Sequence, residues 1–94
     1  MSVDLYLDLY SKCLDKWGTW SQMLMAMEEA SEFIQACSKV MRTQVGAMVP
    51  IDRLAEETAD LELMLDQVKY IFGLDKAVQD WRLKKIDRLE ALLK

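Results

Sequence analysis

The residues best suited to chemistry lie in two short acidic stretches, MEEASE and EETAD. Glu29 and Glu32 are three residues apart in the first stretch, and Glu57 and Asp60 are three residues apart in the second. This spacing makes side chains neighbours on a helix, so each stretch presents a pair of carboxylates. Carboxylates drawn into a helical interior repel one another unless they take up protons or bind cations. Oxygen ligands without histidine favour a hard divalent ion, Mg²⁺ above all, or Mn²⁺.

The helical phase of the first stretch separates its three glutamates. Between about residues 20 and 43, one face of the expected helix is apolar and consists of Met23, Met27, Ala30, Ile34, Cys37 and Met41. Besides this apolar face and a polar face, the helix has a third face, which is mostly apolar and carries Met25, Phe33, Ala36 and Val40. Glu29 and Glu32 share that third face, whereas Glu28 falls on the polar face. We therefore expect Glu28 to be solvated and the other two to point inward.

In the second stretch, the inward direction of the acids is clearer, because they lie on or beside one continuous apolar stripe. Its apolar stripe consists of Leu54, Leu61, Met64, Leu65, Val68, Ile71 and Phe72. Glu57 lies within the stripe and Asp60 borders it, while Glu56, Glu62 and Asp66 are expected to point to solvent. Acidic residues three apart also arise by chance on solvated helices. Two such pairs, both rotated off the polar faces, favour a metal site over that alternative.

A basic counterpart lies in the C-terminal segment. The apolar stripe of that segment consists of Leu74, Val78, Trp81, Leu89 and Leu92. Lys85 lies within the stripe and Arg88 lies beside it, one turn further on. Two interpretations are open. The lysine stem covers apolar surface while its amine reaches water, or the amine is a cation that meets the acidic cluster or a ligand's phosphates.

Four helical segments are expected to position these residues, at about residues 3–16, 20–43, 52–72 and 75–94. Gly18 and Gly73 suit the left-handed position that ends a helix. Thr19 and Gln22 have the spacing of a capping box, and Asp75 can cap the last helix. The stretch QVGAMVP forms a connection. No segment alternates with period two for long enough to form a strand, so the expected fold class is all-α.

Length and composition limit the class of protein. The 94 residues, 52% hydrophobic and 30% charged, suit a single domain over residues 1–94. The net charge of -4 argues against a nucleic-acid partner. With no histidine, a His/Cys zinc site and a His-based nucleophilic triad are excluded. Cys13 and Cys37 form no CxxC pair and are expected to be buried free thiols.

No apolar run approaches the roughly 20 residues of a membrane span. The N-terminal stretch MSVDLYLDLY lacks the basic region, the apolar core and the cleavage site of a leader. We therefore expect a cytoplasmic protein with no membrane partner.

The stretches WGTWSQMLMAMEEASEFIQACSKVMR, LAEETADLELMLDQVKYIFG and KKIDRLEALL resemble the small MazG-like nucleoside triphosphate pyrophosphohydrolases. These belong to the all-α NTP pyrophosphatase superfamily, which includes the dimeric dUTPases. The family motif is E-E-x-x-E, a variable gap, and E-x-x-D. It is matched by Glu28, Glu29 and Glu32, followed by Glu57 and Asp60. The resemblance extends over nearly the whole chain.

The resemblance implies hydrolysis of a (deoxy)nucleoside triphosphate to the monophosphate and pyrophosphate, with water attacking the α-phosphorus. It also implies a four-helix bundle completed by oligomerisation. The implied Mg²⁺ ligands are Glu29, Glu32, Glu57 and Asp60, the same four acids that the helical phase turns inward. The proton of the attacking water is then accepted either by a ligand carboxylate or by Glu28 at the rim.

By resemblance, Lys85 and Arg88 are expected to contact phosphates or brace the acidic cluster. Trp17, Trp20 and Gln22 precede the acidic helix, where similar proteins build part of the nucleoside pocket, and an indole there can stack on a base. The alternative is that the tryptophans pack the corner between two helices and that Gln22 serves only the capping box.

The chain carries one copy of the motif and is near the minimum length for the fold. A homodimer or a dimer of dimers is therefore expected to complete each bundle. Two alternatives to an enzyme remain open. One is a non-catalytic nucleotide- or metal-binding regulatory helical module. The other is a structural interaction protein, for which the seven methionines and the amphipathic helices suffice.

Overall fold

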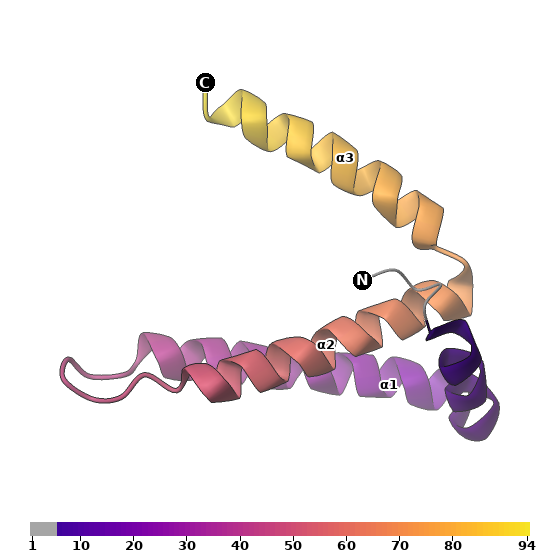
Figure 1. Ribbon diagram of the computed structural model, residues 1–94, viewed down its shortest axis with the longest axis horizontal. Helices are drawn as coiled ribbons and strands as arrows, with labels where there is room; N and C mark the ends of the chain where they lie inside the picture. Colours follow the sequence, from indigo (N-terminus) through magenta and orange to yellow (C-terminus); the bar gives the residue numbers. More distant parts are fainter. Residues whose placement is uncertain (1–5) are drawn as a thin grey trace.

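The computed structural model describes residues 6–94, which form three α-helices (Figure 1). They are α1 (Leu7–Met41), α2 (Ile51–Phe72) and α3 (Asp75–Leu92). No strand occurs within the described range, so the expected all-α class is confirmed there. The radius of gyration is 16.3 Å, whereas a compact chain of this length has about 12 Å. The fold is therefore open, because α3 does not pack along the other helices.

A bend at Gly18 divides α1 into a short arm, residues 7–17, and a long arm, residues 19–41. The backbone leaves the helical conformation there, with φ 80° and ψ 163°. Glycine adopts such a conformation readily, whereas a residue with a Cβ is strained in it. The two arms correspond to the two helices that the sequence predicts in this region. The predicted start of the first helix, at Val3, lies outside the described residues.

The long arm of α1 and α2 run antiparallel and side by side as a hairpin, which residues 42–50 close (Figure 1). The face of α1 that packs on α2 is the one that carries the acidic pair, where Ala36 is 7% exposed. The more continuously apolar face points away from α2, and Met27, Ile34 and Met41 lie exposed on it. A single chain therefore closes its hairpin across the acidic face and leaves much of the apolar face uncovered.

Asp66 on α2 is 8% exposed, although its helical phase predicts a solvated side chain. The short arm of α1 covers it, and the hydroxyl of buried Tyr10 donates a hydrogen bond over 3.3 Å to its Oδ2. The Nζ of Lys69 lies 3.2 Å from its Oδ1. Burial and the charge of Asp66 raise the pKa of Tyr10 above 10.0, so the hydroxyl keeps its proton. The prediction for Asp66 was wrong, because the phase of one helix does not reveal a segment that returns after a bend.

α2 ends at Gly73, as predicted, with a left-handed φ of 63° and ψ of 42°. The N–H of Leu74 donates to the carbonyl of Lys69 over 2.9 Å, and the N–H of Gly73 donates to that of Tyr70. These two bonds make a Schellman closure. Asp75 was expected to cap the last helix but is instead its first residue. Leu74 takes the cap position, without a side-chain hydrogen bond.

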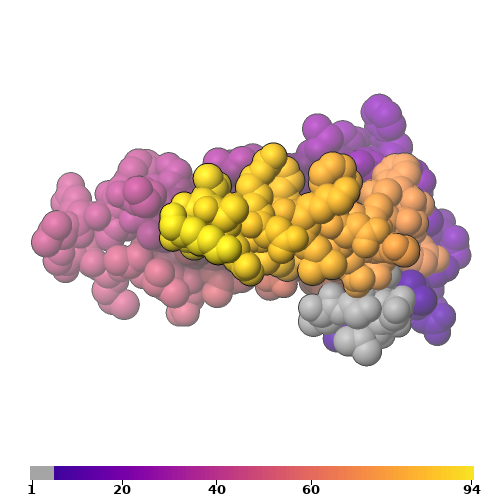
Figure 2. Space-filling model, turned by 90° about the horizontal axis from the view of Figure 1, so that it is seen from above, coloured from indigo at the N-terminus to yellow at the C-terminus, as the bar shows by residue number. Residues whose placement is uncertain are grey.

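α3 diverges from the hairpin after this turn (Figure 1). Every residue from 79 to 94 is exposed, including the large side chains of Trp81, Leu89 and Leu92. Figure 2 shows α3 in yellow and orange at the front of the molecule, with its side chains open to solvent. One chain thus forms a two-helix hairpin with two appendages, the short arm of α1 and α3.

Two further expectations concern the environment of the chain. Among residues 6–94, no helix contains an apolar stretch long enough to cross a membrane. Cys13 and Cys37 are free thiols, as expected, but each is only half-buried.

The hydrogen bond between Tyr10 and Asp66 yields a testable prediction about stability. Tyr10→Phe removes the donor to a buried carboxylate and should lower the free energy of unfolding by about 1–2 kcal/mol. Urea denaturation measures the change. Tyr6→Phe is the matched control, because the Tyr6 ring lies 6.1 Å from that of Tyr10 but is partly exposed. Its effect should stay within about 0.5 kcal/mol. Equal losses in the two variants would contradict the anchoring role of Tyr10.

Candidate metal centre

Three carboxylates converge where the two helices of the hairpin meet. Glu29 comes from α1, and Glu57 and Asp60 come from α2. One oxygen atom of each lies within 4.8 Å of the other two. Glu57 is 2% exposed, whereas Glu29 and Asp60 are half-buried. The packing of the hairpin therefore brings together acids that are far apart in the sequence, and it places one of them in the interior.

Glu32 and Glu28 lie around this cluster. Glu32 follows Glu29 by one turn and is also half-buried. It is not among the three converging ligands, but its charge raises the pKa of both Glu29 and Glu57. Glu28 is exposed, as its phase predicts. The four acids expected to point inward are thus all at least half-buried, and Glu28 marks the solvent side.

Two oxygens of the cluster are buried and have no hydrogen-bond partner among the described residues. They are the Oε2 atoms of Glu29 and Glu57. A buried acceptor is normally paired, and a carboxylate oxygen without a partner destabilises the fold. The acids of a merely solvated helix face would instead be hydrated. Three carboxylates without a nitrogen or sulfur ligand match the ligand preference of Mg²⁺ or Mn²⁺.

The electrostatics of the cluster reflect this crowding. Burial raises the pKa of Glu29 above its ordinary value of 4.5, and the charges of Glu32 and Asp60 raise it further. Burial also raises the pKa of Glu57, while the charge of Arg53 opposes that rise. Glu32 and Asp60 add to the rise for Glu57 as well. These two carboxyls are therefore harder to ionise than ordinary glutamates.

Arg53 is a residue at this site that the sequence interpretation missed. Its Nη2 lies 3.0 Å from Oε1 of buried Glu57, and its Nη1 lies 2.9 Å from Oε1 of exposed Glu56. The signal was present in the sequence, because opposite charges three and four residues apart pair on a helix.

Gln22 lies two turns before Glu29 on the face of α1 that meets α2. It is 5% exposed, and within residues 6–94 its Oε1 has no hydrogen-bond partner. Trp17 and Trp20 flank the bend but are largely exposed, the second at 78%. The indoles therefore do not form a packed corner in the single chain, whereas Gln22 is a buried and unsatisfied polar group.

Lys85 and Arg88 lie exposed on α3. The Nζ of Lys85 is 5.9 Å from the ring centre of Trp81 on the same helix. Because α3 diverges from the hairpin, the fold of a single chain keeps both cations apart from the acidic cluster (Figure 1).

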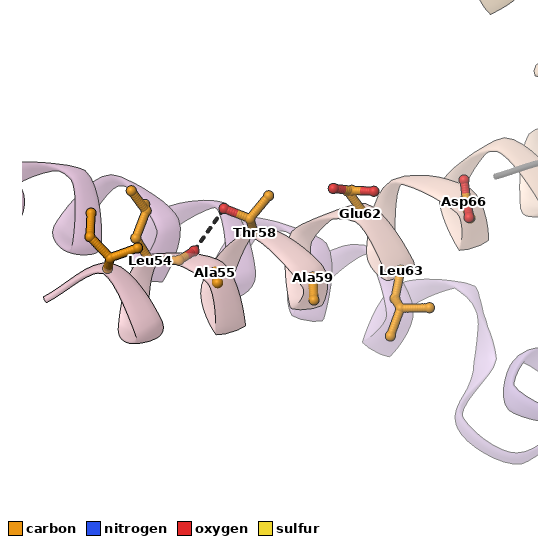
Figure 3. Close-up of a pocket in the computed structure, with 8 residues that line it drawn as sticks. Leu54, Ala55, Thr58, Ala59, Glu62, Leu63 and Asp66 are labelled. Carbon is orange, nitrogen blue, oxygen red and sulfur yellow. Dashed lines mark hydrogen bonds between the residues drawn. The ribbon is translucent and has the colours of Figure 1, made fainter.

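α2 carries a shallow apolar groove of about 590 Å³, lined only by its own residues between Ile51 and Asp66 (Figure 3). Thr58 lies in it and donates its hydroxyl to the carbonyl of Leu54 over 2.7 Å. A second groove, of about 370 Å³, follows one face of α3 and includes Leu89. Each groove follows one face of a single helix and is lined by residues of that helix alone.

Comparisons of the chain with known protein families, with curated proteins and with solved structures found no match. Buried carboxylates with unpaired oxygens are suited to holding a divalent cation, and a cation so held can bind phosphate.

The raised pKa values of Glu29 and Glu57 predict how the metal-free protein responds to pH. Above 4.5, and up to the raised pKa, the folded state holds protons that the unfolded state has released. Stability is therefore lost as the pH rises through the folded pKa, and it is recovered on acidification towards 4.5. Thermal unfolding in a chelator from about pH 5 to 8 measures this dependence. Glu29→Gln should flatten the profile, and an unchanged profile in that variant would refute the assignment.

Proposed function

We propose that this chain is a Mg²⁺-dependent nucleoside triphosphate pyrophosphohydrolase of the MazG-like type. The observation that carries the proposal is the convergence of Glu29, Glu57 and Asp60 between two helices, with buried oxygens that lack partners among the described residues. The resemblance of the acidic stretches to that family supplies the substrate class and the reaction. The products are a nucleoside monophosphate and pyrophosphate.

The three converging carboxylates are the residues that would hold Mg²⁺, and Glu32 is the fourth acid beside them. When bound, the ion neutralises phosphate charge and lowers the pKa of a coordinated water. The protein supplies the orientation, because the packing of α1 on α2 fixes Glu29 against Glu57 and Asp60 before substrate arrives. Such preorganisation reduces the rearrangement needed during the reaction.

The remaining residues supply proton transfer and binding. The oxygen of the attacking water bonds to the α-phosphorus as the bond from that phosphorus to the α,β-bridging oxygen breaks. Pyrophosphate leaves with the bridging oxygen, and the water gives up a proton. Glu28 is exposed beside Glu29, so it can accept that proton without giving up a metal contact. The exposed indoles of Trp17 and Trp20 offer faces on which a base can stack. The unsatisfied Oε1 of Gln22 offers an acceptor for a base or sugar donor.

The second part of the proposal is a homodimer, alone or within a dimer of dimers. The accessible surface is 7577 Å², whereas a folded monomer of this mass exposes roughly 5,600 Å². The excess is larger than the area of about 800 Å² that each partner buries in a standard interface. Pairing of α3 with the hairpin and the short arm of a second copy completes a bundle of four helical segments. It also brings Lys85 and Arg88 to the partner's acidic cluster, where they meet phosphates.

A second candidate function is a non-catalytic nucleotide- or metal-binding regulatory module. The observation that favours it is the separation of the acidic cluster on the hairpin from Lys85 and Arg88 on α3. The carboxylates alone are sufficient to bind an ion, but cleavage of a triphosphate also requires that its phosphate charges be neutralised and positioned.

Pyrophosphate release from a panel of NTPs and dNTPs with Mg²⁺ tests the catalytic proposal. The wild type should release pyrophosphate, and removal of the ion by a chelator should abolish the release. Glu57→Gln keeps the shape of a buried ligand but removes its charge, so kcat/KM should fall by about 10²- to 10³-fold. Asp52→Asn is the matched control, because Asp52 is an exposed acid in the first turn of the same helix. Its activity should be unchanged.

The outcomes of this assay separate the candidate functions. Nucleotide binding without cleavage would replace the enzyme with the regulatory module. Orthophosphate release without pyrophosphate would place the cut at another phosphorus and contradict the proposed reaction. Full activity in Glu57→Gln would remove the acidic cluster from the mechanism.

Light scattering on the purified protein tests the dimer. The mass should be a multiple of twice the chain mass of 10.9 kDa. Leu89→Asp places a charge in the groove of α3 and should shift the protein to monomers that no longer cleave substrate. Ala91→Asp places the same charge on the opposite face of α3 and should leave the dimer intact. A monomeric wild type that retains activity would contradict the shared bundle.

A further inference from the structure

The Arg53 guanidinium bridges the interior and the surface of the acidic cluster. It lies 3.0 Å from the Oε1 of Glu57, which is 2% exposed, and 2.9 Å from the Oε1 of Glu56, whose side chain is 62% exposed. The Arg53 side chain is itself 57% exposed. The other oxygen of Glu57, Oε2, is buried and has no hydrogen-bond partner in the described part of the chain. Arg53 therefore pairs with one oxygen of this carboxylate and leaves the other open.

This contact has a physical cause. A buried carboxylate without a counter-ion is strongly destabilising, and an arginine remains charged at any physiological pH. Among the charged neighbours that influence Glu57, Arg53 lowers its pKa, whereas Glu32 and Asp60 raise it. The partial exposure of Arg53 leaves its guanidinium free to turn towards solvent without breaking the core. Because the guanidinium fork suits phosphate oxygens, the same group can bind a phosphate at the rim.

We infer that Arg53 is an exchangeable counter-ion of the metal site, which competes with the divalent cation for Glu57 and binds substrate phosphate once that cation is in place. The inference rests on the proposed function and adds a residue to it. In the metal-free protein, Arg53 neutralises Glu57. In the loaded protein, the guanidinium is repelled from the site by the bound cation, remains anchored near Glu56, and faces the phosphates.

The two halves of the inference predict effects of opposite sign for one substitution. Arg53→Gln removes the competitor, so Mn²⁺ measured without nucleotide should bind about tenfold more tightly. The same variant loses a phosphate contact, so a non-hydrolysable α,β-methylene triphosphate at saturating Mg²⁺ should bind about tenfold more weakly. A residue with only a structural role would weaken both. Isothermal titration calorimetry measures both affinities.

Thermal unfolding provides a readout that requires neither nucleotide nor activity. In a chelator, Arg53→Gln leaves Glu57 without its counter-ion and should lower the melting temperature by about 4–8 °C. At saturating Mg²⁺, the ion takes over that role, so the difference from the wild type should disappear. Arg53→Lys keeps the charge but lacks the guanidinium fork, so its melting temperature should lie between those of the wild type and Arg53→Gln. This variant also tests the inference if Arg53→Gln does not fold. Arg42→Gln is the matched control, because Arg42 is exposed at the end of α1 and bonds only to the Ser38 carbonyl among the described residues.

The results distinguish failure of this inference from failure of the proposed function. A wild type that binds no divalent ion would overturn both. A wild type that binds Mn²⁺ with the same affinity as Arg53→Gln would overturn only the competition by Arg53. Tighter Mn²⁺ binding together with unchanged affinity for the triphosphate analogue would overturn the phosphate contact. If Arg42→Gln changed the ion affinity, the analogue affinity and the melting temperature as much as Arg53→Gln does, a general loss of positive charge would explain the results.

Discussion

The hairpin of α1 and α2 closes over the carboxylate of Glu57, and this buried charge constrains its surroundings. Arg53 pairs with one oxygen of Glu57, and Glu29 and Asp60 each place an oxygen within 4.8 Å of this carboxylate. The interface is consequently held by apolar contacts around a centre that is unfavourable without a cation. A chain selected for stability alone would place a hydrophobic residue at this position. The arrangement is consistent with a site that gains its stability when an ion binds.

A second constraint follows from the bend at Gly18. It turns the short arm of α1 back onto α2, where Tyr10 covers Asp66. This polar contact anchors the hairpin near the end of α2 from which α3 departs, more than a turn beyond the acidic cluster on α2. The short arm can therefore stabilise the hairpin while the acidic cluster remains open to a ligand.

The separation of acids and cations explains why assembly matters to the proposed function. The hairpin offers carboxylates and an apolar groove, and α3 offers Lys85, Arg88 and an apolar face of its own. Neither apolar surface is covered within the described chain. In the proposed homodimer, a second copy would cover apolar surface and would also bring Lys85 and Arg88 towards the acids.

The sequence by itself determined the helices, the break at Gly18, the stop at Gly73 and the inward phase of Glu29, Glu57 and Asp60. These features depend on local backbone preference and on the period of a single helix. Residues that are close together in the sequence specify both. Only the tertiary structure decided which face of α1 meets α2, that Asp66 is covered, and that α3 stays apart. Those outcomes depend on contacts between distant segments, where one apolar face competes with another for the same partner. The helical period shows that a side chain is turned to one side, but only packing decides whether that side is buried.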